Sequence, residues 1–260
     1  MTPEEMGKSF YRNTLNEQGK HFYDEMLAHF SESQAGEVSL TLFDRDCSSK
    51  DAFAAGEALR NDRPELFFLG TRQWFYSEEK TKGILKYEIL YSEEEFQMIR
   101  FHAKRVLRHI LNDTQRMSLL HRECLIYERV ADVAVYLDRE EPHDHNIVAP
   151  ILRRSGVCEG INALLLLALR MAGIPCIKVI GCGKKSGGGQ AWAMAWPDGR
   201  TPVHLDATWE NHRKGEPSFR HFNLSDRQIS EDHDAFAREY LPRCQKEFLN
   251  YDKICRMPLR

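Results

Sequence analysis

The run INALLLLALRMAG, residues 161–173, constrains the fold more than any other part of the sequence. A helix at a protein surface shows one apolar stripe, whereas this run is apolar on nearly every side, so we expect a helix buried all round. It is far shorter than the roughly 20 apolar residues that a membrane-spanning helix requires. Gly173 and Pro175 end it with the usual stop signal of a helix.

Strand-like segments follow this helix and predict a sheet. Ile174–Ile180 and Gln190–Trp196 are separated by the glycine-rich loop GCGKKSGGG, and a turn at Pro197–Gly199 leads into Thr201–Asp206. Short connections of this kind join neighbouring antiparallel strands. One buried helix packed on an antiparallel sheet is an α+β arrangement, which is the fold class that we predict.

The chain is predicted to divide into three parts. Residues 1–115 form a mostly helical N-terminal extension with short strands, residues 116–232 form the core domain, and residues 233–260 pack a C-terminal helix on the core. Apolar periodicity, a capping box and aromatic β-prone stretches support this division. The expected elements are helices over residues 1–30, from Ser92 to Ile110, over Ser118–Val133 and over Phe236–Phe248, and strands at Leu66–Tyr76 and Ile84–Leu90.

Composition argues against several classes of protein. A formal net charge of −3 offers no basic surface for non-specific binding of nucleic acid. The N-terminal sequence MTPEEMGKSF lacks the apolar segment of a secretory signal, and we expect no membrane partner. Seven cysteines without CxxC pairs argue against a disulfide framework and a zinc ribbon. We therefore expect a reducing, cytoplasmic setting.

Cys158 lies immediately before the buried helix, a position with a chemical use. The positive end of the helix dipole and the free N–H groups there favour a thiolate. The same N–H groups can form an oxyanion hole, and Gly156 and Gly160 allow the backbone to bend and a substrate carbonyl to approach. The alternative is structural, since a buried cysteine also behaves as a small apolar residue.

Several motifs occur in a definite order around Cys158: GVCEG, then AGIP at the helix end, AW, a turn at DG, and HLDATW. This order resembles the transglutaminase-like superfamily, whose core has a papain-like fold. The resemblance implies a Cys–His–Asp triad, in which Cys158 is the nucleophile and Asp206 orients the imidazole. RNDRPELFFL, His143–Asn146 and FNLSD extend the resemblance to a bacterial branch of the superfamily.

Position 190 departs from the family pattern. The family's histidine directly precedes Ala-Trp, and here Gln190 occupies that place. An amide cannot take up a proton near neutral pH, so the site Cys158–Gln190–Asp206 lacks a general base. Gln190 can still hold the geometry, with one hydrogen bond to Asp206 and another to the sulfur. Without an imidazolium neighbour, only the helix terminus is expected to lower the Cys158 pKa.

Three other histidines lie near the predicted site in the sequence. His204 precedes Asp206 by two residues, so on a strand both side chains face the same side. A structural role is favoured for His204, and a loop-fixing role for His143 and His145. A metal site in the segment His143-Asp144-His145 would lack a further ligand at a recognisable spacing elsewhere in the sequence. We expect neither a metal nor a cofactor.

The function therefore has alternatives. The resemblance implies a cysteine acyltransferase or hydrolase that forms a thioester with a peptide or carboxamide substrate. The glutamine motivates a second alternative, a catalytically silent pseudoenzyme that binds a peptide or protein partner. In a third, residue 190 of this chain was altered from histidine to trap an inactive form.

Overall fold

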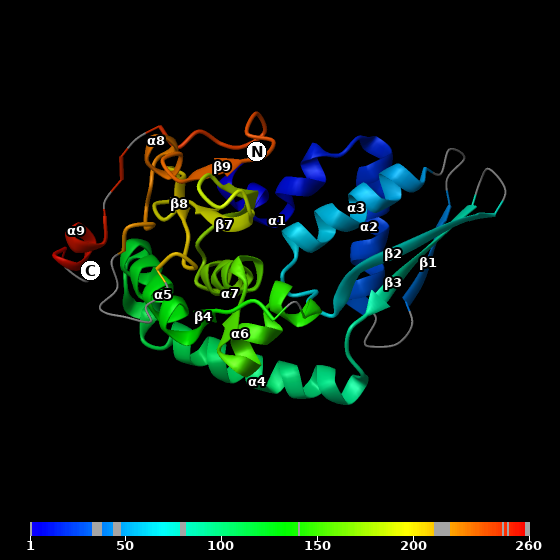
Figure 1. Ribbon diagram of the computed structural model, residues 1–260, viewed down its shortest axis with the longest axis horizontal. Coiled ribbons are helices and arrows are strands. Elements are labelled where there is room, and N and C mark those ends of the chain that lie inside the picture. Colours follow the sequence, from blue (N-terminus) through cyan, green and yellow to red (C-terminus); the bar gives the residue numbers. More distant parts are fainter. Residues whose placement is uncertain are drawn as a thin grey trace. The chain divides into compact units, whose positions relative to one another are not determined.

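The computed structural model describes residues 2–32, 38–43, 48–78, 82–139, 141–210, 219–245, 247–248 and 250–257. The chain forms two compact units, one of Ser9–Phe101 and the other of Met1–Lys8 together with His102–Arg260 (Figure 1). The division lies inside helix α4 (Glu93–Leu111), whereas the sequence predicted a boundary after residue 115. Within the described part of the chain, no helix combines the length and apolar character needed to cross a bilayer.

The first thirty residues form two helices instead of the one that their periodicity suggests. Helix α1 (Pro3–Thr14) contains a kink at Ser9, where φ is −155° and ψ is 37°, and α2 (Glu17–Glu32) follows it. The carboxylate of Asp62, at the end of α3 (Ser49–Asp62), accepts two backbone N–H groups of α1 just after the kink, both at 3.0 Å. These hydrogen bonds cap the second half of α1 in the way that a side chain caps a separate helix.

A three-stranded antiparallel sheet completes the smaller unit. Its order is β1-β3-β2, with β1 at Val38–Phe43, β2 at Leu69–Glu78 and β3 at Lys82–Ile89. The sequence predicted β2 and β3 within a few residues of these bounds but not β1. The predicted capping box opens α4, since Ser92 N donates to Glu95 Oε2 at 2.8 Å and Glu95 N donates to Ser92 Oγ at 3.3 Å.

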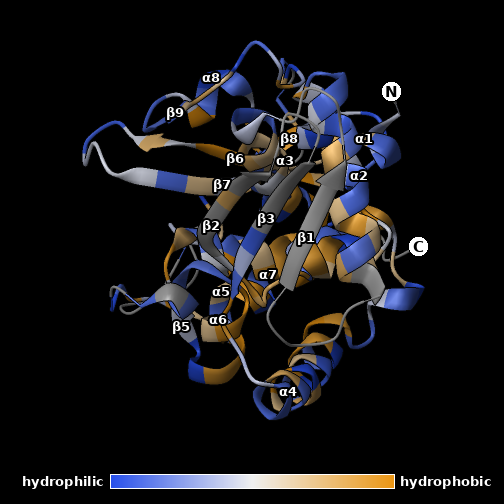
Figure 2. Ribbon diagram, turned by 90° about the vertical axis from the view of Figure 1, so that its right-hand side faces the viewer, coloured by the Kyte–Doolittle hydropathy of each residue, from blue (hydrophilic) through white to orange (hydrophobic). Residues whose placement is uncertain are grey.

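Helix α7 (Cys158–Met171) is the centre of the larger unit and is buried on nearly all sides, as its composition predicts. Figure 2 shows it in the colour of hydrophobic residues. It packs against β6 (Cys176–Gly183) and β7 (Gly189–Ala195), the middle strands of an antiparallel sheet of order β8-β7-β6-β9. The outer strands are β8 (Val203–Leu205) and β9 (His233–Ala235). The α+β fold is confirmed.

Shorter elements precede α7. A 3₁₀ turn η1 (Thr114–Arg116) leads to helix α5 (Leu119–Val133), which the Ser118 side chain caps by accepting from the N–H of His121. The next elements are β4 (Val135–Tyr136), the 3₁₀ turn η2 (Pro142–His145), α6 (Val148–Arg153) and β5 (Ser155–Gly156), with β4 and β5 paired in parallel.

The predicted helix over Phe236–Phe248 is wrong for the described residues of that stretch, which are turns and irregular chain. Pro242 falls in the middle of it, where a proline removes a helical hydrogen bond and clashes with the preceding turn. The C-terminal part instead contains α8 (Asp226–Ile229), β9 and a short helix α9 (Tyr251–Cys255).

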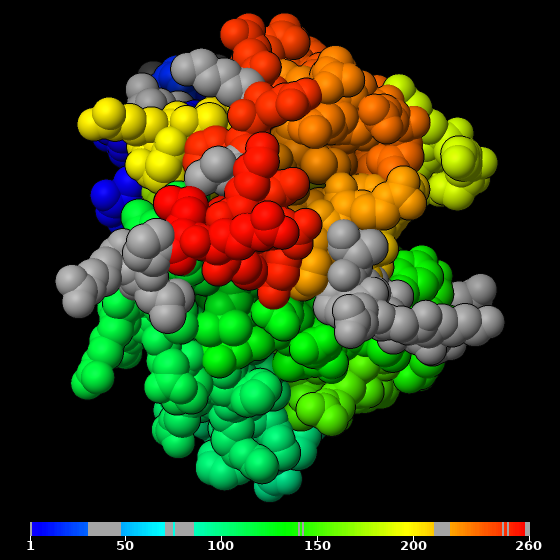
Figure 3. Space-filling model, turned by 90° about the vertical axis from the view of Figure 1, so that its left-hand side faces the viewer, coloured from blue at the N-terminus to red at the C-terminus, as the bar shows by residue number. Residues whose placement is uncertain are grey.

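Helix α9, which lies further along the chain than the predicted helix, packs on α5. The ring of Tyr251 stacks on Phe219 with centroids 3.4 Å apart, and its hydroxyl donates to Glu128 Oε2 of α5 at 3.1 Å. Figure 3 shows this C-terminal segment, in red, against the orange segment that contains α8.

Candidate active site

Cys158 occupies the first turn of α7, and the backbone around it is packed too closely for larger residues. Val157 is the N-cap, and its N–H donates to the carbonyl of Asp144 at 3.2 Å. A Cβ atom added at Gly160 would lie 2.5 Å from the same carbonyl oxygen and 2.7 Å from that of Asn146. Turn η2 therefore lies directly across the start of α7, and the glycine of GVCEG is required by that contact.

The sulfur of Cys158 lies against strand β7. Its Sγ is 3.9 Å from the carbonyl oxygen of Gly189, and the residue is 9% exposed. Burial raises the pKa of the thiol, the Asp206 carboxylate raises it further, and hydrogen bonding from the Ala191 backbone opposes the change. The expected lowering by the helix terminus is therefore outweighed by desolvation, and the thiol is held in its neutral form.

Gln190 and Asp206 come together as the motif order predicts. Gln190 lies on β7 and Asp206 directly follows β8, the antiparallel neighbour of β7. The amide Nε2 of Gln190 donates to Asp206 Oδ2 at 2.6 Å, and both residues are buried. The sulfur contacts the Gly189 carbonyl instead of the Gln190 amide, so the expected bridge from sulfur to carboxylate is formed on its carboxylate side only.

Asp206 accepts four hydrogen bonds on its side chain. Oδ1 accepts from Asn162 Nδ2 at 3.1 Å and from the Thr208 N–H at 2.8 Å. Oδ2 accepts from Gln190 and also from Nε2 of His233 at 3.0 Å. Asn162 lies one turn after Cys158 on α7, so helical spacing from the cysteine could have identified it.

His233 is the functional candidate that the sequence analysis missed. It is fully buried on β9, with Nε2 facing Asp206 and Nδ1 2.5 Å from Asp232 Oδ1. The rings of Trp192 and Trp209 flank it, with centroids at 5.0 Å and 4.4 Å. No local pattern marks His233, because only the pairing of β9 with β6 brings it to Asp206.

His204 has the structural role that was favoured for it. Its Nδ1 accepts from Trp192 Nε1 at 3.0 Å, which places the ring proton on Nε2, 3.1 Å from Asp226 Oδ1. Burial lowers the pKa of His204, although Asp226 acts in the opposite direction. This neutral imidazole joins β7, β8 and α8.

The loop histidines do not converge on a metal with Asp144. His145 Nδ1 is 3.2 Å from Glu159 Oε2, and Lys178 pairs with the other oxygen of Glu159. Burial would raise the pKa of Glu159, but Lys178 and His145 together lower it to about 2. Asp144 is turned away and accepts from the Arg139 N–H at 2.9 Å. His145 thus holds the residue that follows Cys158, in agreement with the loop-fixing role.

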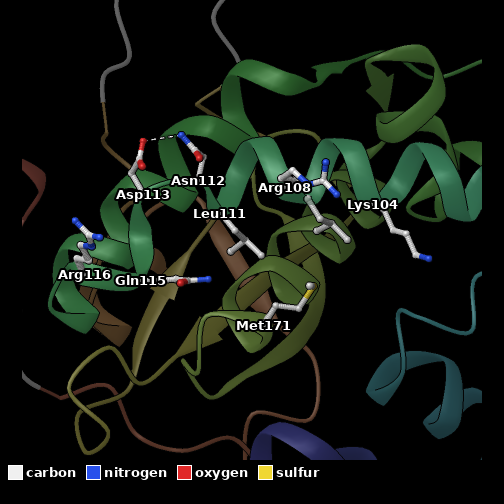
Figure 4. Close-up of a pocket in the computed structure, with 9 residues that line it drawn as sticks. Lys104, Arg108, Leu111, Asn112, Asp113, Gln115, Arg116 and Met171 are labelled. Atoms are coloured by element: carbon white, nitrogen blue, oxygen red, sulfur yellow. Dashed lines mark hydrogen bonds between the residues drawn. The ribbon is translucent and has the colours of Figure 1, made fainter.

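A separate groove of about 860 Å³ lies at the opposite end of α7. Leu111 of α4 and Met171 of α7 project into it (Figure 4). At about 1.5 Å per residue, Met171 is about 20 Å from Cys158 along the helix, so this groove is distinct from the cysteine site. The lining residues are Lys104, Leu107, Arg108, Leu111, Asn112, Asp113, Gln115, Arg116 and Met171.

Comparison with known proteins identifies the family that this part of the chain resembles. Residues 108–207 match the transglutaminase-like superfamily. Two solved structures are similar. One is a TGase, at 11% identity and a TM-score of 0.38, over 80% of this chain and 56% of that one. The other is a candidate cysteine protease from Cytophaga hutchinsonii, at 13% identity and a TM-score of 0.34, over 53% of this chain and 61% of that one. The chain thus spans less than two thirds of either protein.

No curated protein sequence matches the chain. The family match covers the helix that carries Cys158, the strand that carries Gln190, and Asp206. The chain thus contains a transglutaminase-like domain at residues 108–207.

Proposed function

We propose that the Cys158 site of this domain binds a peptide or protein segment and is catalytically silent at neutral pH. The carrying observation is that Gln190 takes the place of the base and is bonded to Asp206 at 2.6 Å. Acyl transfer requires a thiolate and an acid to protonate the leaving group. An amide can supply neither proton transfer, and burial keeps the thiol neutral.

His233 does not replace the missing base in this arrangement. Its Nε2 faces Asp206 and its Nδ1 faces Asp232, so both ring nitrogens are engaged by carboxylates. A base must reach within about 3 Å of the proton that it removes. The imidazole therefore holds Asp206 and offers the sulfur no free ring nitrogen as a proton acceptor.

A second candidate function is cysteine acyl transfer, and the placement of Cys158 on the first turn of α7 favours it. The sulfur would attack the substrate carbonyl carbon while its proton passes to the departing amine. The C–N bond then breaks, and water or a second amine cleaves the resulting thioester. N–H groups at the start of α7 would stabilise the oxyanion.

Alkylation of Cys158 by iodoacetamide, followed by mass spectrometry from pH 6 to pH 10, separates the two candidates. The unaltered protein should react at Cys158 only at alkaline pH, because burial raises the pKa of the thiol above its ordinary value. Gln190→His should lower the midpoint by several units, as an imidazolium does in papain-like sites. Cys255, which is exposed, serves as the internal reference.

Gln190→Asn is the matched control, because it keeps an amide and should keep the alkaline profile. Rapid alkylation of unaltered Cys158 at pH 6, or accumulation of a peptide thioester on Cys158 at neutral pH, would establish the acyl-transfer function and exclude the silent one.

A further inference from the structure

A cluster of three potential metal ligands lies next to Asp206. His221 comes from the chain before α8, Asp232 from the turn after it, and His233 from β9. His221 Nε2 is 2.9 Å from Asp232 Oδ2, and His233 Nδ1 is 2.5 Å from Oδ1 of the same carboxylate. The three ligand atoms all lie within 4.8 Å of one another.

Each imidazole of the cluster also faces a buried carboxylate with its other nitrogen. His233 Nε2 is 3.0 Å from Asp206 Oδ2, and His221 Nδ1 is 3.4 Å from Glu210 Oε1. Both carboxylates are fully buried. Metal-binding histidines almost always have such a carboxylate or carbonyl behind them, because it fixes the tautomer and makes the coordinating nitrogen more basic.

The ligand types of the cluster also suit a divalent cation. Two imidazole nitrogens with one carboxylate are the protein ligands of several catalytic zinc sites, in which the fourth position stays open.

Little movement is needed to admit an ion. Around zinc, with bonds of about 2.0–2.1 Å, neighbouring ligand atoms of a tetrahedron are about 3.3 Å apart. If Oδ2 of Asp232 coordinates the ion, its 2.9 Å separation from His221 Nε2 must open by about 0.4 Å, and if Oδ1 does, its 2.5 Å separation from His233 Nδ1 must open by about 0.8 Å. The Asp232 side chain is 26% exposed, which leaves a route for the ion and a side open for a fourth ligand.

A second cluster in the same unit, His204, Asp226 and Cys244, provides a contrast. Because Trp192 donates to Nδ1 of His204, the nitrogen that faces Asp226 carries the proton and cannot coordinate. Asp226 is also engaged by Arg238 at 3.2 Å. This cluster is satisfied by hydrogen bonds and is the natural control.

We propose that His221, Asp232 and His233 bind a divalent transition metal of the zinc class through Nε2, a carboxylate oxygen and Nδ1. Imidazole nitrogen with a single carboxylate suits zinc, cobalt or iron better than magnesium or calcium. The sequence predicted no metal, because a His-x10-Asp-His spacing matches no recognised ligand pattern. The site is independent of turnover at Cys158, but its ligand His233 also holds Asp206.

The test is a titration of the chelator-treated, full-length protein with Co²⁺, followed by competition with Zn²⁺. One equivalent should bind, with visible d–d absorption and without a sulfur-to-cobalt charge-transfer band. Tryptophan fluorescence should be quenched, because the Trp209 ring lies 4.4 Å from His233 and 5.1 Å from His221. Asp232→Asn, nearly the same in shape, and His221→Gln should each weaken binding by more than about tenfold.

Cys244→Ala is the matched control and should leave both affinity and spectrum unchanged. Circular dichroism identifies a variant that fails to fold. Asp232→Asn should fold most readily, because the Asp232 side chain is partly exposed. The proposal is overturned by the absence of saturable Co²⁺ binding, by binding that survives both Asp232→Asn and His221→Gln, or by a sulfur charge-transfer band that Cys244→Ala removes.

Discussion

Asp206 and its neighbours mark how far single residues could be predicted from the sequence. The meeting of Gln190 with Asp206 followed from motif order alone, since each motif falls on a known place of the matched fold. The direction of the Cys158 pKa shift could not be predicted, because it depends on how much of the sulfur is buried. The position of His233 could not be predicted either, because its partners come from strands far away in the sequence.

At Gly160 the close approach of turn η2 yields a sharp prediction. Gly160→Ala should lower the free energy of unfolding by more than about 2 kcal/mol, because the new methyl group meets two backbone oxygens at 2.5 Å and 2.7 Å. Gly189→Ala is the matched control, since a Cβ there meets nothing within 4 Å. Urea denaturation measures both. Equal stability of the two variants would contradict the packing described at the start of α7.

Among the elements, helices with end signals were predicted well, and strands defined by distant partners were not. Helices α4 and α5 begin within one residue of the expected positions, and α7 begins three residues before the apolar run that predicts it, because capping and periodicity are local properties. Strands β1 and β9 were missed, since their hydrogen-bonding partners lie elsewhere in the chain. The helix predicted over Phe236–Phe248 does not form in the described residues, because Pro242 interrupts the stretch.

Helix α5 carries a buried acid that should make stability depend on pH. Burial raises the pKa of Glu123 to about 8, although Asn223 donates to it at 3.2 Å. The unfolded chain ionises near pH 4.5 and the folded one only near pH 8, so stability should fall as pH rises between these values. The slope is at most about 1.4 kcal/mol per pH unit.

Glu123→Gln should remove this dependence, so its stability relative to the unaltered protein should increase from pH 5 to pH 8. Urea unfolding at both pH values gives the difference, with Glu94→Gln on the exposed side of α4 as the control. A constant difference between Glu123→Gln and the unaltered protein at the two pH values would show that Glu123 is ionised in the folded state.

At the scale of the whole molecule, the larger unit is built from both ends of the sequence. Met1–Lys8 belongs to it, together with the chain after residue 101. A Cβ at Gly7 would lie 3.2 Å from the backbone nitrogen of Cys176, so α1 begins against the entry to β6. The sequence could not predict this contact, because nothing local relates a terminal helix to a strand so distant in the chain.

Removal of residues 1–8 should therefore destabilise the cysteine-containing unit, although these residues lie far from it in sequence. The melting temperature should fall by several degrees, since about 1 kcal/mol corresponds to a few degrees in a domain of this size. Gly7→Val should act in the same direction through the close contact at Cys176. Gly188→Ser is the control, since a Cβ there meets nothing closer than 3.7 Å. An unchanged melting curve after the deletion would show that the terminal segment contributes no packing.

The four donors around the Asp206 side chain set a limit on what this carboxylate can do. An ionised carboxylate has about four lone-pair directions, and here each oxygen accepts two hydrogen bonds. No lone pair is left over to accept a further hydrogen bond from a substrate. Asp206 thus joins α7, β7 and β9 through hydrogen bonds that use its whole acceptor capacity. Replacing it should disturb the folding of the site as well as any reaction there.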